Sequence, residues 1–127
     1  MKKIYLLGTL LSVLGLILPC DAQKNIIGNT QKIGKLEVAQ RDLPSQLKWD
    51  EAFKACAKLG PGWRLPNKEE LNLLYLNKAK IGGLSGQYYW TVSESSDGRA
   101  WLQFFNDGTQ DDYYKISKCW VRAVHDL

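Results

Sequence analysis

The sequence contains a single histidine, His125, near the end of the chain. Catalytic triads and most zinc sites depend on histidine, and one histidine cannot form a cluster of ligands. No nucleophile, base and orienting group can be named together, so the sequence does not indicate an enzyme, and it indicates no metal or other cofactor. We expect His125 to be an exposed surface residue, because chain ends usually are.

The sequence also lacks a basic tract. Its 17 Lys and Arg residues and 13 Asp and Glu residues give a net charge of +4. Both signs are interspersed along the chain, whereas nucleic-acid-binding proteins usually gather Lys and Arg on one face. The composition therefore argues against nucleic acid as a partner, although a weak preference for acidic ligands is compatible with it.

No apolar run is long enough to span a membrane. The longest, Ile4 to Leu18, is shorter than the roughly 20 residues that a spanning helix needs. A short basic end precedes it and Ala22 follows it, which predicts a secretory signal peptide over residues 1–22. The protein would then be exported to the periplasm, the cell surface or the medium, with no stable membrane span. A retained anchor and a lipoprotein lipidated at Cys20 are the alternatives.

Removal of residues 1–22 leaves 127 minus 22, or 105 residues, and a net charge of 15 minus 12, or +3. That length suits one small domain. Residues 23–32 are polar and without periodicity, so we expect a flexible leader there. The domain is expected to cover residues 33–127, without internal repeats.

Cysteine is scarce. Beyond Cys20, the sequence has only Cys56 and Cys119. In an oxidising compartment these two would form a single disulfide. In the alternative, Cys56 is a small buried hydrophobe on a helix and Cys119 is unpaired in a strand. The sequence leaves both alternatives open.

Two helices are predicted in the first half of the domain. Trp49, Ala52, Phe53 and Cys56 follow helical spacing, so we expect an amphipathic helix that buries these four side chains and ends at Gly60. A second helix is expected to begin at an N-cap three residues before a glutamate, which is the spacing of a capping box. The residues concerned are the cap Asn67, Glu70, and the buried stripe Leu71, Leu74 and Tyr75.

The second half of the chain is rich in aromatic and turn-forming residues, which is typical of short strands joined by tight loops. Strands are predicted over residues 34–40, 88–92, 100–105, 113–116 and 119–124, with a loop over 93–99 and a reversal at Asp107-Gly108. Helices followed by antiparallel strands indicate an α+β fold.

The large aromatic and basic side chains are first interpreted as structural. A small domain needs large apolar areas, so the five tryptophans are expected mainly in the core. They are Trp49, Trp63, Trp90, Trp101 and Trp120. Arg64 is expected to bond carbonyls or a carboxylate where the two helices meet, because its planar fork suits such a joint.

Several short motifs occur in a fixed order. They are Lys48-Trp49-Asp50-Glu51-Ala52, Ala55-Cys56, Gly62-Trp63-Arg64-Leu65-Pro66, Glu70-Leu71, Tyr89-Trp90, Ala100-Trp101, Asp107-Gly108 and Val121-Arg122-Ala123-Val124. This series resembles the bacterial domain of unknown function 1566, also called the Lcl C-terminal domain, over Ile33 to Leu127. The resemblance implies a C-type-lectin-like fold, in which two helices pack on a small twisted antiparallel sheet and a loop-rich face binds ligands without catalysis.

The sequence departs from this family at two points. Some relatives carry a cysteine where Ala123 stands, so the family's pairing with the helix cysteine cannot be transferred to Cys119. The Glu-Pro-Asn, Gln-Pro-Asp and Trp-Asn-Asp elements with which many C-type lectins hold calcium are absent. Asp107, Asp111 and Asp112 offer clustered oxygen ligands, so calcium is an alternative to a solvated acidic turn.

The predicted binding face combines Tyr, Ser, Asp and Gly, a mixture that suits adaptable recognition. Its candidate ligand-binding residues are Tyr88, Glu94, Ser96, Asp97, Arg99, Gln103, Phe105, Asp107, Gln110, Asp111, Asp112, Tyr113 and Lys115. We expect an exported binding module that recognises a glycan or a protein. The alternative is a structural or assembly component of the cell envelope.

Overall fold

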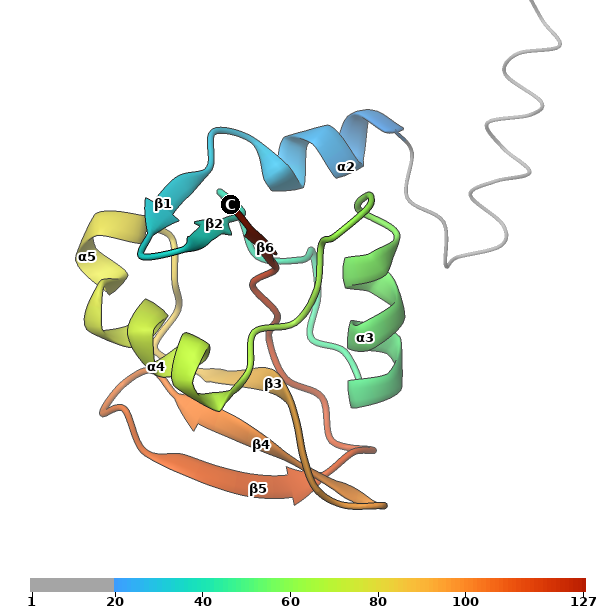
Figure 1. Ribbon diagram of the computed structural model, residues 1–127. Coiled ribbons are helices and arrows are strands. Elements are labelled where there is room, and N and C mark those ends of the chain that lie inside the picture. Colours follow the sequence, from blue (N-terminus) through green and yellow to red (C-terminus); the bar gives the residue numbers. More distant parts are fainter. Residues whose placement is uncertain (1–19) are drawn as a thin grey trace, which may run out of the picture.

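The computed structural model describes residues 20–127, which form helices and two three-stranded antiparallel sheets (Figure 1). The sheet orders are β1-β2-β6 and β3-β4-β5. The elements are α2 (Cys20–Ile27), β1 (Gln31–Ile33), β2 (Leu36–Val38), α3 (Trp49–Ala57), α4 (Lys68–Leu76), α5 (Lys78–Ile81), β3 (Tyr88–Ser96), β4 (Arg99–Phe104), β5 (Gln110–Tyr114) and β6 (Val124–Asp126).

The expectation of a flexible leader over residues 23–32 is wrong. This stretch contains most of α2 and the start of β1. Ile26 is only 5% exposed and belongs to the core. The backbone N–H groups of Gln40 and Arg41 donate to the carbonyls of Ile27 and Ile26 at 2.9 and 3.1 Å. One buried side chain and two backbone hydrogen bonds thus attach a segment whose composition is otherwise polar.

The predicted signal peptide, residues 1–22, lies outside the described residues except for its last three, which begin α2. Cleavage after Ala22 therefore stays a prediction. Within residues 20–127, no helix is both long and apolar enough to cross a membrane.

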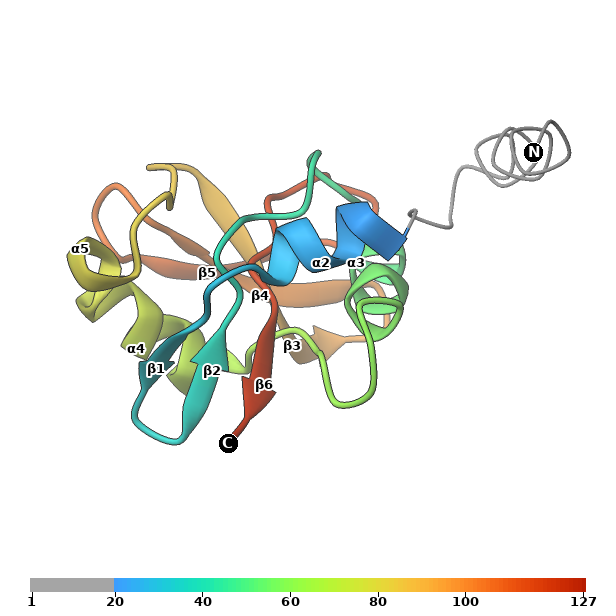
Figure 2. The ribbon, with the colours of Figure 1, turned by 90° about the horizontal axis from the view of Figure 1, so that it is seen from above.

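The strand expected over residues 34–40 is a hairpin instead. Gly34 has a φ of 59°, which glycine adopts readily, and it turns the chain from β1 into β2. On its other side β2 pairs with β6, and Figure 2 shows the three strands side by side with the C-terminus at the end of β6. The last strand was predicted over residues 119–124 but begins only at Val124. Cys119 and Trp120 do not belong to a continuous strand, and each makes only an isolated bridge, to Leu47 and Tyr89 respectively.

The first predicted helix is confirmed as α3, but one of its four buried positions is wrong. Trp49, Ala52 and Cys56 are buried, whereas Phe53 is 51% exposed. The core contacts only the narrow stripe of α3 that carries these three residues. Phe53 lies beside that stripe, with its ring 5.8 Å from the Trp49 ring.

The second predicted helix is confirmed as α4, together with its capping box. The backbone N–H of Glu70 donates to the Asn67 side chain at 2.8 Å, and the Glu70 carboxylate accepts from the Asn67 N–H at 2.9 Å. Leu71 and Leu74 are buried, and Tyr75 is half-buried. A short separate turn, α5, follows before the chain enters β3.

Arg64 has the structural role expected for it. Its guanidinium donates to both Glu70 oxygens at 2.7 and 2.8 Å and to Asp126 at 2.7 Å. The hydrogen bond from Arg64 is the main cause that lowers the pKa of Glu70 below its usual range. Because Asp126 lies in β6, Arg64 ties the start of α4 to the C-terminal strand.

The expectation that His125 is an exposed terminal residue is wrong. Its side chain is half-buried, with its ring centre 5.2 Å from that of Trp63. The ring nitrogen Nε2 lies 3.0 Å from the Pro61 carbonyl oxygen. Pairing of β6 with β2 holds the end of the chain against the body, which explains this burial.

The larger sheet confirms the predicted strands with shifted ends. β3 runs to Ser96, so most of the predicted 93–99 loop is strand, and a tight turn at Asp97 and Gly98 leads into β4. β5 begins at Gln110, three residues before the predicted strand. In Figure 1 this sheet lies at the bottom, with α3 and α4 at opposite sides above it.

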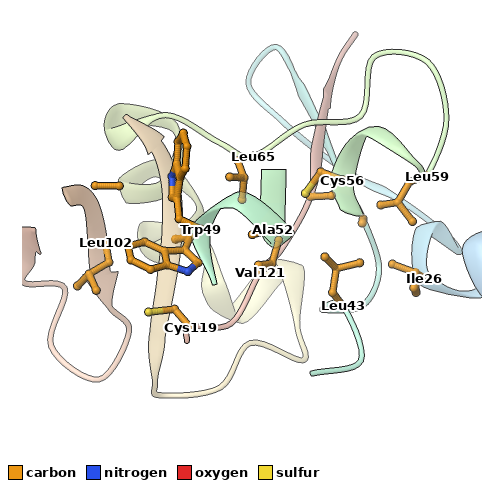
Figure 3. Packing of buried hydrophobic residues seen from close by; sticks show 14 residues of the cluster. Ile26, Leu43, Trp49, Ala52, Cys56, Leu59, Leu65, Leu102, Cys119 and Val121 are labelled. Atoms are coloured by element: carbon orange, nitrogen blue, oxygen red, sulfur yellow. The ribbon is translucent and has the colours of Figure 1, made fainter. Parts of the chain in front are cut away.

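The core confirms part of the expectation for tryptophan. Trp90 and Trp49 are buried, and the other three tryptophans are half-buried. The disulfide proposed between Cys56 and Cys119 is not formed, since both are free and buried. Figure 3 shows the two sulfurs apart within the cluster, with Ala52 and Val121 between them. Burial raises the pKa of each thiol to about 12.

A buried polar group joins the loop after β2 to the final segment. Arg122 is 1% exposed and donates from Nε to Asp42 at 2.7 Å. The Tyr89 hydroxyl also donates to Asp42, at 2.6 Å. A buried charge needs such partners, because an unpaired one is costly. Arg122 is thus part of the scaffold.

Candidate functional site

The most prominent exposed feature of the β3-β4-β5 sheet is a cluster of three aromatic rings. Tyr88 and Phe104 are directly opposite in the register of β3 and β4. Their rings stack at 4.6 Å with an interplanar angle of 26°. The Tyr113 ring, from β5, lies 5.7 Å from the Tyr88 ring. Tyr88 and Tyr113 are 37% and 39% exposed, so their rings are accessible from solvent.

Strand alternation places this cluster at the border of the core. Tyr113 is opposite Ala100, which shares a face of β4 with Phe104 because side chains repeat every second residue. Leu102 shares that face and, like Ala100, is buried. The aromatic rings therefore continue the apolar surface of the core out to solvent.

Two exposed carboxylates accompany the rings. Asp107 lies in the turn after β4, and Asp111 lies opposite Leu102 on β5. A hydrogen bond with Tyr113 is the main cause that raises the pKa of Tyr88, and the charges of both aspartates raise it further. We call Tyr88, Phe104, Asp107, Asp111 and Tyr113 the aromatic-acidic patch.

The other end of the β3-β4 hairpin is occupied by internal charge pairs. Arg99 donates from Nε to Asp112 at 2.9 Å, and the Ser95 hydroxyl donates to the same carboxylate at 2.7 Å. These two bonds lower the pKa of Asp112, with Arg99 the larger cause. Lys115 donates to Glu94 at 2.5 Å. Four predicted ligand-binding residues therefore have partners within the chain, namely Glu94, Arg99, Asp112 and Lys115.

Two further predicted positions on this hairpin remain accessible. Ser96 ends β3 and Asp97 lies in the following turn, and both are exposed. The Asp97 carbonyl accepts from Lys115 at 2.8 Å. The predicted face thus includes this hairpin tip and the aromatic-acidic patch, which extends from Tyr113, opposite Ala100, to Tyr88 and Phe104 at the other end of β4.

Gln103 and Phe105 were expected on the binding face, and this expectation is wrong. Gln103 is completely buried, with its amide donating to Asn72 at 2.9 Å. Phe105 is 1% exposed, and the centre of its ring lies 4.6 Å from the centre of the Tyr89 ring. Gln110 is half-buried and donates to the Lys68 carbonyl at 2.9 Å. Helix α4 covers this face of the sheet, which makes these side chains structural.

Phe104 belongs to the patch but was missed from the sequence. The sequence did contain a pattern that could have revealed it. Ala100, Leu102 and Phe104 occupy every second position of the predicted strand and therefore share one of its faces. Choosing that face required knowing that α4 covers the other. Phe53 was missed as an exposed residue because helical spacing alone placed it with the core.

The calcium alternative finds no support in the geometry. Among residues 20–127 no group of three or more His, Cys, Asp or Glu side chains could hold a metal ion. Asp112 is engaged by Arg99 and Ser95, and an Asp107 oxygen accepts from the Thr109 N–H at 2.9 Å. Calcium needs roughly six to eight oxygen ligands, which this turn does not gather.

Comparison with known proteins identifies the fold. No family model and no curated protein sequence matches the chain. Among solved structures, the chain is similar to botrocetin, a snake C-type-lectin-like protein, with a TM-score of 0.57 and 13% sequence identity. The match covers 77% of this chain and 96% of botrocetin. The chain has a C-type-lectin-like fold.

A second structure gives the same result. It is a complex of botrocetin with the A1 domain of a von Willebrand factor mutant, matched with a TM-score of 0.55, 12% identity, and coverage of 77% of this chain and 96% of that one. Identities this low establish the C-type-lectin-like fold alone. The resemblance to the domain of unknown function 1566 predicted this fold correctly, while membership of that family is not shown.

Proposed function

We propose that this chain is an exported, non-catalytic binding module that holds a protein partner on the aromatic-acidic patch. The observation that carries this proposal is the contact of two exposed rings, Tyr88 and Tyr113, with each other and of Tyr88 with the half-buried Phe104 ring, with two exposed carboxylates beside them. Tyrosine and phenylalanine offer large, rigid contact areas at a low cost in conformational entropy. Such aromatic anchors dominate the energetics of many protein interfaces.

The charge of the patch indicates the chemistry of the partner. Asp107 and Asp111 are negative, and the patch contains no basic residue. A Lys or Arg side chain of a partner could pair with either carboxylate and lie over an aromatic face. Botrocetin, which shares the fold, forms a complex with a protein domain, and this supports a protein ligand. A glycan bound by the same rings is the alternative ligand.

The absence of catalysis is part of the proposal. Both thiols of the domain are buried and their pKa is raised to about 12, which leaves them almost wholly protonated and unreactive. The imidazole of His125 lies against two backbone carbonyls and the Trp63 ring. A structural role in the cell envelope is the second candidate, because an exposed aromatic cluster also suits a permanent interface.

The test uses the full chain immobilised and exposed to envelope extract and culture medium. We expect wild type to retain one stoichiometric protein, and the double variant Tyr88→Ala/Tyr113→Ala to lose it. Tyr114→Ala is the matched control, because Tyr114 is 62% exposed and lies over Arg99, outside the patch. Binding should weaken as salt is raised, because exposed charges are screened.

Three other outcomes would count against the proposal as stated. Equal capture by wild type and the double variant would exclude the patch. Binding to a glycan array that requires Tyr88 and Tyr113, without any protein capture, would replace the protein ligand by a glycan. Release of the partner only by detergent or denaturant, with no effect of salt, would favour the permanent envelope component.

A further inference from the structure

A shallow pocket that contains no residue of the aromatic-acidic patch lies between the start of α3 and the end of β3. It encloses about 250 Å³ and is lined by Trp49, Asp50, Phe53, Lys54 and Glu94. Tyr88 and Glu94 are six residues apart on β3, and at the usual rise per residue this is about 20 Å. The Tyr113 end of the patch is nearer, because Glu94 and Tyr113 both pair with Ala100 from opposite sides of β4, but no residue of the patch lines the pocket.

The floor of the pocket is aromatic and fixed in place. The indole N–H of Trp49 donates to the Thr91 carbonyl at 2.9 Å, which locks the ring against β3. Lys115 Nζ lies 4.3 Å from the centre of the same ring. Phe53 extends this floor outward and is 51% exposed. An exposed phenylalanine on a helix with an otherwise polar outer face offers an open π face to a ligand.

The charges around the pocket cancel. Asp50 and Glu94 are negative, while Lys54 and Lys115 are positive. Glu94 and Lys115 pair with each other at 2.5 Å. Within residues 20–127, the carboxylate of Asp50 and the ammonium of Lys54 have no side-chain hydrogen-bond partner, so both are available to a ligand. Hydrogen-bond acceptors and a donor thus stand beside an apolar floor, with no excess of either charge.

We propose that this pocket binds one neutral sugar ring. A pyranose has an apolar face of C–H groups, which carry slight positive charge and pack on the negative face of an aromatic ring. Its hydroxyl groups both donate and accept, so they can bond to Asp50 and Lys54 together. A net charge of zero favours a neutral ligand over a polyanion or a basic peptide.

The size of the pocket supports a single ring. Pockets for drug-sized ligands usually enclose roughly 300–1,000 Å³. At about 250 Å³ this one is smaller and open to solvent on one side. It suits a terminal or internal sugar unit of a longer chain, with the rest of that chain lying outside. The inference is independent of the protein partner proposed for the aromatic-acidic patch.

The test is a titration of the full chain with the methyl glycosides of glucose, galactose, mannose and N-acetylglucosamine, followed by NMR. At least one glycoside should shift the Trp49 indole N–H signal saturably, with an affinity that salt leaves unchanged, because the ligand is neutral. Phe53→Ala should weaken this binding by tenfold or more. Tyr114→Ala, which removes an exposed ring elsewhere, should leave it unchanged.

Retained circular dichroism would show that Phe53→Ala is folded, as expected for a side chain outside the core. The inference is overturned if no glycoside shifts the Trp49 signal, or if Phe53→Ala binds as wild type does. It is also overturned if Tyr88→Ala/Tyr113→Ala abolishes the glycoside shifts, since the sugar would then occupy the other patch. Loss of protein capture alone leaves this inference standing, so the two proposals fail separately.

Discussion

At the scale of single residues, the two cysteines of the domain give a direct prediction. Cys56 and Cys119 are free, and burial raises the pKa of each to about 12. A thiol reacts with iodoacetamide as the thiolate, so we expect neither to be alkylated in the native protein at neutral pH. Both should be alkylated in denaturant without any reductant. Peptide mapping by mass spectrometry measures each site, and modification that appears only after reduction would demonstrate the bridge instead.

Residue-level interpretation of the sequence succeeded where local chemistry decides the outcome. The Asn67 cap and the bond from Arg64 to Glu70 follow from side-chain geometry close in sequence, and both roles were predicted, whereas the bond from Arg64 to the distant Asp126 was not. It failed where burial depends on distant elements. Gln103 and Phe104 are neighbours in one strand, and the polar residue is buried while the aromatic one is partly exposed. Only the position of α4 explains this reversal.

At the scale of elements, the helices were predicted more accurately than the strands. α3 and α4 have their own start and stop signals, so their existence and approximate ends followed from the sequence. Strand ends depend on partners. β6 consists of Val124–Asp126 because it pairs with β2, which is far away in the sequence. Nothing within residues 119–124 reveals that register.

The two turns of the β3-β4-β5 sheet provide an element-scale prediction with an internal control. Gly108, between β4 and β5, has a φ of 84°, and an added Cβ would lie 2.6 Å from Tyr75 Cε2. Positive φ and collision with a packed ring should together cost about 2 to 4 kcal/mol in Gly108→Ala. Gly98, between β3 and β4, lacks a positive φ, and no atom lies within 4 Å of its added Cβ.

Gly98→Ala should therefore change the free energy of unfolding by no more than about 0.5 kcal/mol, because the reduced freedom of the unfolded chain offsets any small loss in the turn. Urea unfolding followed by tryptophan fluorescence measures both variants. Equal stabilities for Gly98→Ala and Gly108→Ala would show that the Tyr75 ring and the turn can relax, contrary to this interpretation.

At the scale of the whole molecule, the two ends of the described chain are integrated into one body. β6 closes the sheet with β2, and α2 adds Ile26 to the same core that contains Trp49, Cys56 and Trp90. In Figure 2 α2 lies beside α3 when seen from above. The sequence indicated the C-type-lectin-like fold through ordered motifs but missed this N-terminal helix, because one buried isoleucine produces no periodic signal.

The contribution of α2 can be measured through that isoleucine. Ile26→Ala removes a side chain that is 5% exposed, and the lost burial and the cavity left behind should together cost about 2 to 4 kcal/mol. Lys24→Ala, on the exposed side of the same helix, should cost less than about 0.5 kcal/mol. Urea unfolding of the full chain compares the two.

A difference between these variants would mean that the folded body begins before residue 33, so the domain boundary moves toward the N-terminus. Cleavage after Ala22, as the sequence predicts, would retain Ile26 and the hydrogen bonds of Gln40 and Arg41 to this segment. Export would then leave the domain with its N-terminal contacts intact. Equal stabilities for Ile26→Ala and Lys24→Ala would instead return residues 23–32 to the role of a leader that adds nothing to the fold.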